Sequence, residues 1–140
     1  MGLDNGVIIK AKTIRAEELL KENFSYLDRD YSPLEYEFDY WRKQWNMRDR
    51  VLTVFSDKYN NNDCVILMNY LDLYNYVDKV LKYFLDEDNY NNCEHSYYWD
   101  WHDFIVSIAQ GIKNITDFLI LVKEKEILES EFEIYWYDSY

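Results

Sequence analysis

The chain has 140 residues, with 27 Asp and Glu against 15 Lys and Arg, which gives a formal net charge of −12. A protein this anionic repels nucleic acid and anionic lipid and attracts basic protein surfaces. Hydrophobic residues make up 49% of the chain and aromatic residues 19%, so a folded core is expected and intrinsic disorder is excluded. We therefore expect a single domain over residues 1–140 that binds neither nucleic acid nor membrane directly.

The sequence also indicates where the protein resides. The N-terminus lacks a basic region followed by an apolar run, so no signal peptide is expected. No apolar stretch approaches the roughly 18 residues that a membrane span needs. Cys64 and Cys93 are 29 residues apart, which is no metal-ligand spacing and favours two reduced thiols. These features predict a soluble, cytoplasmic protein without metal or cofactor.

The first elements are a short strand and a short helix. Val7-Ile8-Ile9 is a β-branched run behind an Asn5-Gly6 turn signal, which predicts a strand over residues 6–12. Thr13 then precedes the segment Ala16–Leu20, whose acidic first turn is typical of a helix start.

The next segment carries a stronger helical signal. Ser32-Pro33-Leu34-Glu35 combines an N-cap hydroxyl, a proline at the first helical position and a glutamate three residues after the cap. Behind it the residues spaced alternately by four and three are Leu34, Phe38, Trp41, Trp45, Arg48, Leu52 and Phe55. This spacing lines one face of a helix, so we predict a long helix over residues 33–56.

Residues 64–68, in the middle of the chain, allow two predictions. Residues 64–68 form an apolar run that fits either a buried strand or the opening of the following helix. Asn69, with Asp72 three residues later, provides a helix cap, and the apolar spacing that follows predicts a helix over residues 70–85. Residues 86–93 are polar and rich in asparagine, and we predict a loop there.

A third helix and a last strand complete the predicted fold. From Trp101 to Val122 apolar residues keep the four–three alternation, which predicts a helix over about residues 98–126. Residues 131–137 alternate acidic or Tyr positions with Phe132, Ile134 and Trp136, as in a half-buried strand. The fold class is therefore α+β, with three amphipathic helices packed on a small, mainly antiparallel sheet in which the N- and C-terminal strands are neighbours.

Acidic residues are segregated in the second half of the chain. No Lys or Arg occurs between Tyr83 and Ile112 or after Lys125. The candidate partner-binding residues in these stretches are Asp86, Glu87, Asp88, Glu94, Asp100, Asp103, Glu131 and Glu133. In the simplest interpretation they complement a helix N-terminus and keep the outer face of a strand in water.

The functional interpretation is that these acids converge into one anionic patch. Such a patch would copy the phosphate spacing of a nucleic acid and occupy the basic groove of a protein that handles nucleic acid. The 15 tyrosines exceed what a core of this size needs, so several should be exposed among the acids, where they favour an interface.

Two smaller groups of residues could carry chemistry. Arg48 lies on the predicted apolar stripe after Trp41 and Trp45, and its guanidinium could stack on an indole or form an anion pocket walled by the two tryptophans. The plainer interpretation is an arginine at the edge of the stripe that pairs with a carboxylate.

The other group combines one thiol with two imidazoles. Cys93, His95 and His102 lie within a few residues of several carboxylates, as nucleophile–base pairs and zinc sites do. Their spacing matches neither pattern, and we expect ordinary surface histidines and no catalytic or metal site.

Three short stretches carry a resemblance. At residues 1–6 (MGLDNG), 40–48 (YWRKQWNMR) and 137–140 (YDSY), the chain resembles a group of small proteins without an assigned activity from low-GC Gram-positive bacteria and their phages. The resemblance implies an origin in a phage or mobile element, and it brings no site residues.

Three functions compete. The leading hypothesis is a protein–protein interaction protein, of the kind that phages use to inhibit host defence (anti-CRISPR-like), which blocks a basic nucleic-acid-binding surface by acidic mimicry. The alternative is a small ligand-binding domain or enzyme with a pocket at Trp41, Trp45 and Arg48. The third is a structural protein whose acidity serves only solubility.

Overall fold

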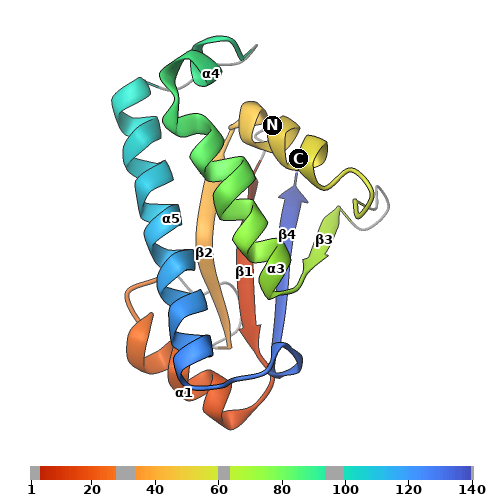
Figure 1. The fold of residues 1–140 in the computed structure, drawn as a ribbon, viewed down its shortest axis with the longest axis vertical. Helices are drawn as coiled ribbons and strands as arrows, with labels where there is room; N and C mark the ends of the chain where they lie inside the picture. The colour runs from red at the N-terminus through yellow and green to blue at the C-terminus, as the bar shows by residue number, and fades with distance from the viewer. Residues whose placement is uncertain (1–3, 28–33, 60–63, 94–99, 140) are drawn as a thin grey trace.

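The structure is a computed structural model that describes residues 4–27, 34–59, 64–93 and 100–139. An antiparallel four-stranded sheet in the order β2-β1-β4-β3 forms one layer, and helices form the second (Figure 1). The strands are β1 (Asp4–Ala11), β2 (Glu35–Arg42), β3 (Val65–Met68) and β4 (Phe132–Ser139). The α-helices are α1 (Ile14–Asn23), α2 (Trp45–Val54), α3 (Tyr70–Asn75), α4 (Glu87–Asn91) and α5 (Trp101–Glu124). The predicted α+β fold class is confirmed.

The two terminal strands pair at the centre of the sheet. β1 runs antiparallel to β4 along its whole length, from Asp4 opposite Ser139 to Ala11 opposite Phe132. Every second residue of each strand points into the core, and Val7, Ile9 and Trp136 are fully buried there. The predicted neighbourhood of the terminal strands is confirmed, and residues 64–68, for which strand and helix were both open, contain β3.

The predicted helix over residues 33–56 is wrong. Its first half is β2 and its second half is α2, and Lys43, with a left-handed φ of 56°, lies in the turn between them. A β-bulge on β2 explains the false helical spacing: Val7 pairs with Asp39 but Ile8 pairs with Glu37, so one residue of β2 is left over. The bulge places both Phe38 and Asp39 on the buried side.

The predicted helix over residues 70–85 is confirmed as a continuous helical segment. Asn69 caps α3 in a capping box with Asp72, as the sequence suggests. After α3 the chain continues as a π-helical stretch, η1 (Tyr76–Leu81), and a 3₁₀ turn, η2 (Lys82–Leu85). The predicted loop over residues 86–93 is wrong in part, because Asp86 caps the short helix α4 by accepting from the Asp88 amide.

The long helix α5 packs its inner face on the sheet, and its bounds confirm the predicted helix within the described residues. The buried face is turned slightly from the predicted stripe, since Phe104, Gly111 and Phe118 are buried with Ile108 and Ile115. In the described part of the chain α5 alone is long and apolar enough to cross a membrane by length and composition. In this fold it is the core helix of the helical layer.

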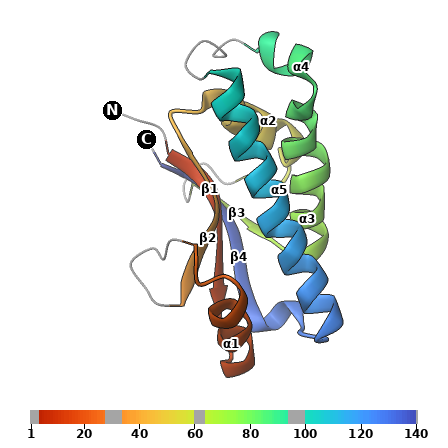
Figure 2. The same cartoon turned by 90° about the vertical axis from the view of Figure 1, so that its left-hand side faces the viewer.

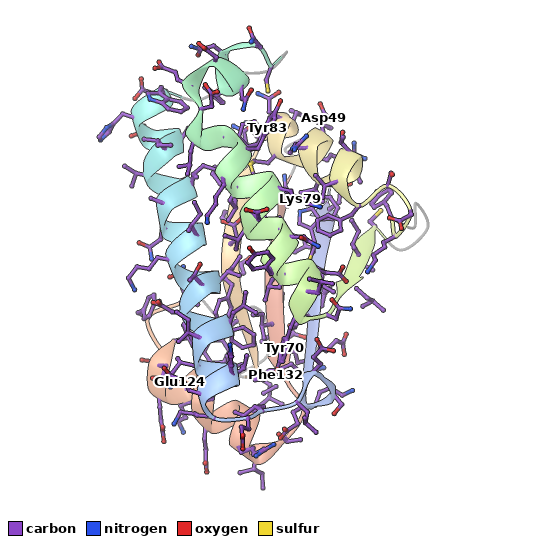
Figure 3. The ribbon with its side chains drawn as sticks, in the orientation of Figure 1. Asp49, Tyr70, Lys79, Tyr83, Glu124 and Phe132 are labelled. Carbon is purple, nitrogen blue, oxygen red and sulfur yellow. The ribbon has the colours of Figure 1, made fainter. Side chains whose placement is uncertain are left out.

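An aromatic cluster closes the lower end of the core. Tyr70 of α3 and Phe132 of β4 lie near each other there (Figure 3). The Phe118 ring of α5 contacts both, with centroid distances of 6.2 Å to Tyr70 and 5.0 Å to Phe132. Such aromatic pairs fix the position of α5 relative to the sheet.

Candidate functional site

The structure places the predicted acidic residues at opposite ends of the molecule. Asp86, Glu87 and Asp88 belong to α4 and its cap, and Asp100 and Asp103 to the start of α5; these elements lie at one end of the long axis (Figure 1). The start of β4, which carries Glu133 and follows Glu131, lies at the other end. A single patch uniting all of these acids is therefore not formed, and Glu94 lies outside the described residues.

Glu131 is built into the fold. It accepts hydrogen bonds from Arg15 Nε at 2.6 Å and Thr13 Oγ1 at 2.9 Å, and from the Leu128 amide at 3.0 Å. The pKa of the Glu131 carboxyl is lowered to about 2, and the hydrogen bond from Arg15 is the main cause. Because the residue is only 9% exposed and its charge is paired, Glu131 braces α1 against β4 and offers little to a partner.

The acids near α4 and α5 have local structural roles as well. Asp86 caps α4, and Asp100 caps α5 by accepting from the His102 amide at 3.2 Å. Asp103 lies in the first turn of α5, where a carboxylate complements the helix dipole. The simpler interpretation of these residues therefore accounts for their positions, although all of them remain exposed.

The residues of the predicted Trp/Arg pocket lie in different surroundings. Trp41 is fully buried in the core, where its Nε1 donates to Asp39 Oδ2 at 2.7 Å. Arg48 lies 5.9 Å from the Trp45 ring, a cation–π distance, while its Nε donates to Asp138 Oδ2 at 2.8 Å. The plainer interpretation, an arginine paired with a carboxylate, describes the arrangement.

The predicted thiol and imidazole group is only partly described. His95 lies outside the described residues, and His102 is exposed on α5. The Cys93 thiol donates to the Asn89 carbonyl at 3.1 Å, and burial is the main cause that raises its pKa, which favours the unreactive thiol. Cys93 lines a hollow beside α2 together with Asp49 and Tyr83 (Figure 3). Across the described ranges no group of three or more metal-binding side chains occurs.

One face of the sheet is left open by the helices. Figure 2 shows α3, α4 and α5 on the same side of the sheet, and no described helix covers the other side. The strand register assigns the side chains of this open face to four cross-strand rows. From one end of the sheet to the other they are Arg42–Asp4–Ser139, Tyr40–Gly6–Tyr137–Val65, Glu37–Ile8–Tyr135–Leu67 and Glu35–Lys10–Glu133.

The rows of the open face differ in chemistry. Apart from Glu37, the two central rows are aromatic and aliphatic; Tyr40 is 46% and Leu67 66% exposed on the two edge strands, whereas Ile8 between them is 3% exposed. The outer rows are charged, and Lys10 Nζ lies 3.9 Å from Glu35 Oε1 in one of them. An aromatic centre with a charged margin is the composition of protein–protein interfaces. Glu133 is the predicted partner-binding residue that lies on this face.

The Tyr137 side chain on β4 reaches across β1 to β2. Its hydroxyl donates to Glu37 Oε1 at 3.0 Å, although β4 and β2 are separated by β1 and so by roughly 10 Å. The ring can reach because position 6, its neighbour on β1, has no side chain. Burial is the first cause that raises the Tyr137 pKa, followed by the nearby charge of Glu37. The phenol therefore stays protonated and donates to the carboxylate.

A second tyrosine is held in the same way. The Tyr40 hydroxyl donates to Asp4 Oδ1 at 3.1 Å, and its pKa is raised by burial and by Asp4. The nearby charge of Asp4 also helps to raise the pKa of Tyr137. The open face thus carries two tyrosine–carboxylate pairs side by side.

β2 carries a buried carboxylate, on the side facing the helices, that the sequence analysis missed. Asp39 is 6% exposed and accepts from Trp41 Nε1 and from the Tyr76 hydroxyl of η1. Burial raises the pKa of Asp39, and the two hydrogen bonds lower it. Burial is the larger effect, so the pKa rises from its ordinary 3.8 to about 6. A β-bulge and a π-helical turn, both frequent near functional sites, meet at this residue. A small hollow of about 160 Å³, lined in part by Glu37, Ser107 and Gln110, reaches it.

The raised pKa predicts how stability depends on pH. A carboxyl whose pKa is higher in the folded state adds stability below its unfolded pKa, and this stability is lost as pH rises through the folded value. Replacing Asp39 by asparagine removes this contribution. As the pH rises from about 5 to 7.5, the free energy of unfolding of the wild-type protein should therefore fall by about 1–1.5 kcal/mol more than that of Asp39→Asn. Urea denaturation of both proteins at each pH measures the difference, and parallel pH profiles would refute it.

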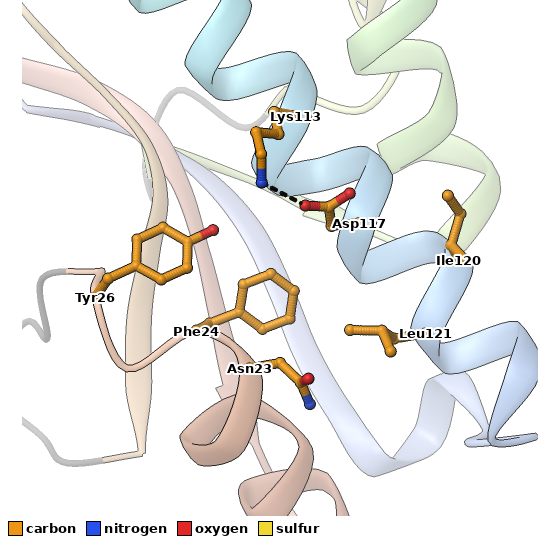
Figure 4. A pocket seen from close by; sticks show the side chains of 7 residues that line it. All are labelled: Asn23, Phe24, Tyr26, Lys113, Asp117, Ile120 and Leu121. Carbon is orange, nitrogen blue, oxygen red and sulfur yellow. Dashed lines mark hydrogen bonds and ion pairs between the residues drawn. The ribbon is translucent and has the colours of Figure 1, made fainter.

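Two further hollows offer little for catalysis. The one between α1 and α5, of about 310 Å³, contains Lys113 and Asp117, which bond each other at 2.8 Å (Figure 4). A groove of about 460 Å³ beside the end of α5 is apolar, with Tyr70, Leu119 and Leu128 in its lining. Neither brings a nucleophile and a base together.

Sequence reasoning missed the open face because it is assembled from strands far apart in the chain. The excess of tyrosines and the alternation of acids with aromatic residues in 35–41 and 131–137 were its available signals. A comparison of the chain with protein-family models, with curated protein sequences and with solved structures found no match.

Proposed function

We propose that this protein acts by binding a partner protein, and that the open face of its sheet docks on a basic surface of that partner. The observation that carries the proposal is the pattern of this face, in which two largely aromatic and aliphatic rows, with Tyr40 and Leu67 exposed at the two edge strands, lie between two charged rows. The net charge of −12 adds a long-range attraction toward basic proteins, which speeds association.

The size of the face indicates the kind of complex. Strands about 4.8 Å apart with a rise of about 3.3 Å per residue give this sheet a flat area of roughly 400–500 Å². A standard interface buries about 800 Å² on each partner. The open face therefore supports a small, electrostatically assisted contact.

The partner that fits best is a protein whose basic surface otherwise holds nucleic acid. Aromatic rings between carboxylates present stacking faces and negative charges together, as bases and phosphates do. A cytoplasmic inhibitor of a host-defence nuclease, encoded by a phage, combines this chemistry with the resemblance noted above. Net repulsion between two copies of so acidic a chain disfavours a self-complex through the same face.

A photo-crosslinking experiment tests the proposal. A benzophenone amino acid replaces Leu67 on the open face or, as the matched control, Leu71 on α3; the two leucines are 66% and 64% exposed. In the organism that encodes the protein, position 67 is expected to capture a nucleic-acid-binding protein that position 71 does not. The captured protein is then purified, and its affinity for wild-type, Leu67→Lys and Leu71→Lys chains is measured by calorimetry.

The expected result is at least a tenfold loss of affinity for Leu67→Lys, little change for Leu71→Lys, and displacement of the partner's DNA by the wild-type chain. Affinity should fall as salt rises, because exposed charges are screened over about 10 Å at 0.1 M. Equal capture at both positions, no capture at position 67, or a complex indifferent to salt and DNA would overturn the proposal.

A further inference from the structure

We propose that the outer edge of β3 is a strand-addition site, at which an extended, basic segment of the partner protein pairs with the backbone of Val65 and Leu67 and extends the sheet. This inference rests on the proposed function and specifies how the partner is held. Side chains of the partner contact the open face, and one stretch of its main chain bonds the edge of the sheet.

The outer edge of β3 presents unpaired main-chain groups. β3 is the outermost strand of the sheet and pairs with β4 (Figure 1). The Asp138 amide donates to the Cys64 carbonyl at 2.9 Å, in the register of these two strands. Every second residue of an antiparallel strand bonds its neighbour, so Ile66 also faces β4. The N–H and C=O groups of Val65 and Leu67 therefore point away from β4, and among the described residues none of them is hydrogen-bonded.

The opposite edge of the sheet is protected in ways that β3 lacks. β2 has a bulge and carries Glu35 and Glu37, and its Phe38 carbonyl accepts from Asn114 Nδ2 of α5 at 3.4 Å. Bulges, charges and covering helices are the means by which proteins keep an edge strand from pairing with another chain. β3 reads Val-Ile-Leu-Met, without charge, proline or bulge, and Leu67 is 66% exposed. β3 is therefore the edge that is open to an extended chain.

The free groups of β3 have the spacing of a strand. Val65 and Leu67 are two residues apart, so their N–H and C=O groups repeat about every 6.7 Å. Alternate residues of a second strand match this repeat, whereas the backbone groups of a helix are bonded within the helix. On the open face, side chains of the added strand continue the rows that contain Tyr137–Val65 and Tyr135–Leu67. Apolar, β-branched residues fit there.

Acidic side chains near one end of β3 favour a basic segment. Glu129 Oε1 accepts from the Tyr70 amide at 2.9 Å, two residues after β3 ends, and the Glu129 side chain is exposed. The outer row of the open face on the same side, Glu35–Lys10–Glu133, carries one more negative than positive charge. With the net charge of −12, these carboxylates attract a cationic side chain at the end of the segment and disfavour a second copy of this chain as the added strand.

Synthetic peptides test the edge without knowledge of the partner. The probe is acetyl-Lys-Val-Thr-Val-Thr-Lys-amide, titrated into the isotope-labelled full chain and followed by NMR. We expect saturable shifts that include the Val65 and Leu67 amides, and slower hydrogen exchange of these two amides in the complex because their N–H groups become bonded. An analogue with glutamate in place of both lysines should bind at least about fivefold more weakly.

N-methylation of the peptide separates main-chain pairing from side-chain contact. A methyl group on an amide nitrogen removes its N–H and blocks the approach of another strand. Only every second N–H of a bound strand faces β3. Of two analogues, methylated on both valines or on both threonines, one should therefore bind at least about tenfold more weakly than the unmethylated peptide, and the other should keep its affinity.

A variant of the protein assigns the binding to β3. Leu67→Pro removes an outward N–H without removing a hydrogen bond to β4, a place where edge strands accept proline, and it should abolish the saturable shifts. The matched control Leu67→Thr keeps the N–H and a side chain that favours strands, and it should bind within about threefold of wild type. If Leu67→Pro does not fold, the two methylated peptides decide the question.

Four results would overturn the proposal. They are the absence of saturable binding, equal effects of the two methylation patterns, and unchanged binding to a folded Leu67→Pro variant. The fourth is protection of the Val65 and Leu67 amides that increases with protein concentration in the absence of peptide, because the added strand would then come from a second copy of the chain.

The two proposals fail separately. If the methylation patterns act alike while position 67 still captures a basic partner, the strand-addition site is wrong and the docking face stands. If the peptide adds to β3 in one methylation pattern but no partner is captured through position 67, the proposed function is wrong and the edge remains a site for an extended basic segment.

Discussion

Replacing Arg48 by methionine should destabilise the protein by about 3–5 kcal/mol at neutral pH, the range for removing one partner of a buried ion pair. The Asp138 side chain is fully buried, and its Oδ2 accepts from Arg48 Nε at 2.8 Å and from the Tyr59 hydroxyl at 3.1 Å. Methionine keeps much of the packing volume of the arginine stem. The substitution removes the positive charge of Arg48, which among the described residues is the only ion-pair partner of Asp138.

The double variant Arg48→Met with Asp138→Asn separates charge from packing. Once the carboxylate is gone, no uncompensated charge is buried, so the double variant should recover at least half of the stability that Arg48→Met alone loses. Urea denaturation of wild type, both single variants and the double variant completes the cycle. Additive losses would show that the pair contributes through packing and that its charges are unimportant.

The same region explains where α2 begins. Asn5 of β1 is fully buried, and its Nδ2 donates to the Gln44 carbonyl at 3.3 Å, immediately before the helix. Asn5 pairs with Asp138 in the β1–β4 register, so the hydrogen bond and the ion pair of Arg48 hold α2 to the same end of the sheet. Buried polar contacts of this kind fix position more than they add stability.

The sequence predicted well where one pattern governs a whole element. β4 alternates strictly, and the helical segment over residues 70–85 has both its cap and its apolar face within one stretch of chain. β2 could not be read in this way. Its bulge makes Tyr36, Phe38, Asp39 and Trp41 all face inward, so the strand loses its period of two. What remains, Phe38 and Trp41 three residues apart, then imitates a helix.

The candidate site depended on contacts that no single segment contains. Glu133 and the surplus of tyrosines were recognised, but the open face is defined by the pairing of β1 with β2 and β4. The hydrogen bond between Tyr137 and Glu37 joins residues 100 positions apart. Likewise Glu131 resembled a surface acid until Arg15, 116 residues away, was found paired with it. Such partners follow from strand order, which local periodicity does not determine.

Gly6→Ala should cost at least about 3 kcal/mol of stability or prevent folding. A Cβ at position 6 would lie 2.1 Å from the backbone carbonyl oxygen of Asp39, which the β-bulge brings over β1. A backbone atom in the middle of a paired sheet cannot move aside without breaking strand hydrogen bonds. The new methyl group would also lift Tyr137 from its position across β1.

Gly111→Ala is the matched control, because it approaches the same residue from the helical side. Its Cβ would lie 2.7 Å from Asp39 Oδ1 and 3.3 Å from Leu81 Cδ1, which are side-chain atoms. Side chains can shift, and alanine is favoured over glycine inside a helix by about 1 kcal/mol, so part of the strain is offset. We expect Gly111→Ala to fold with a modestly lower urea midpoint, while Gly6→Ala is largely insoluble or unfolded. If both variants were equally stable, the bulge would not hold the Asp39 carbonyl against β1, and the position of the Tyr137 ring across that strand would lose its structural basis.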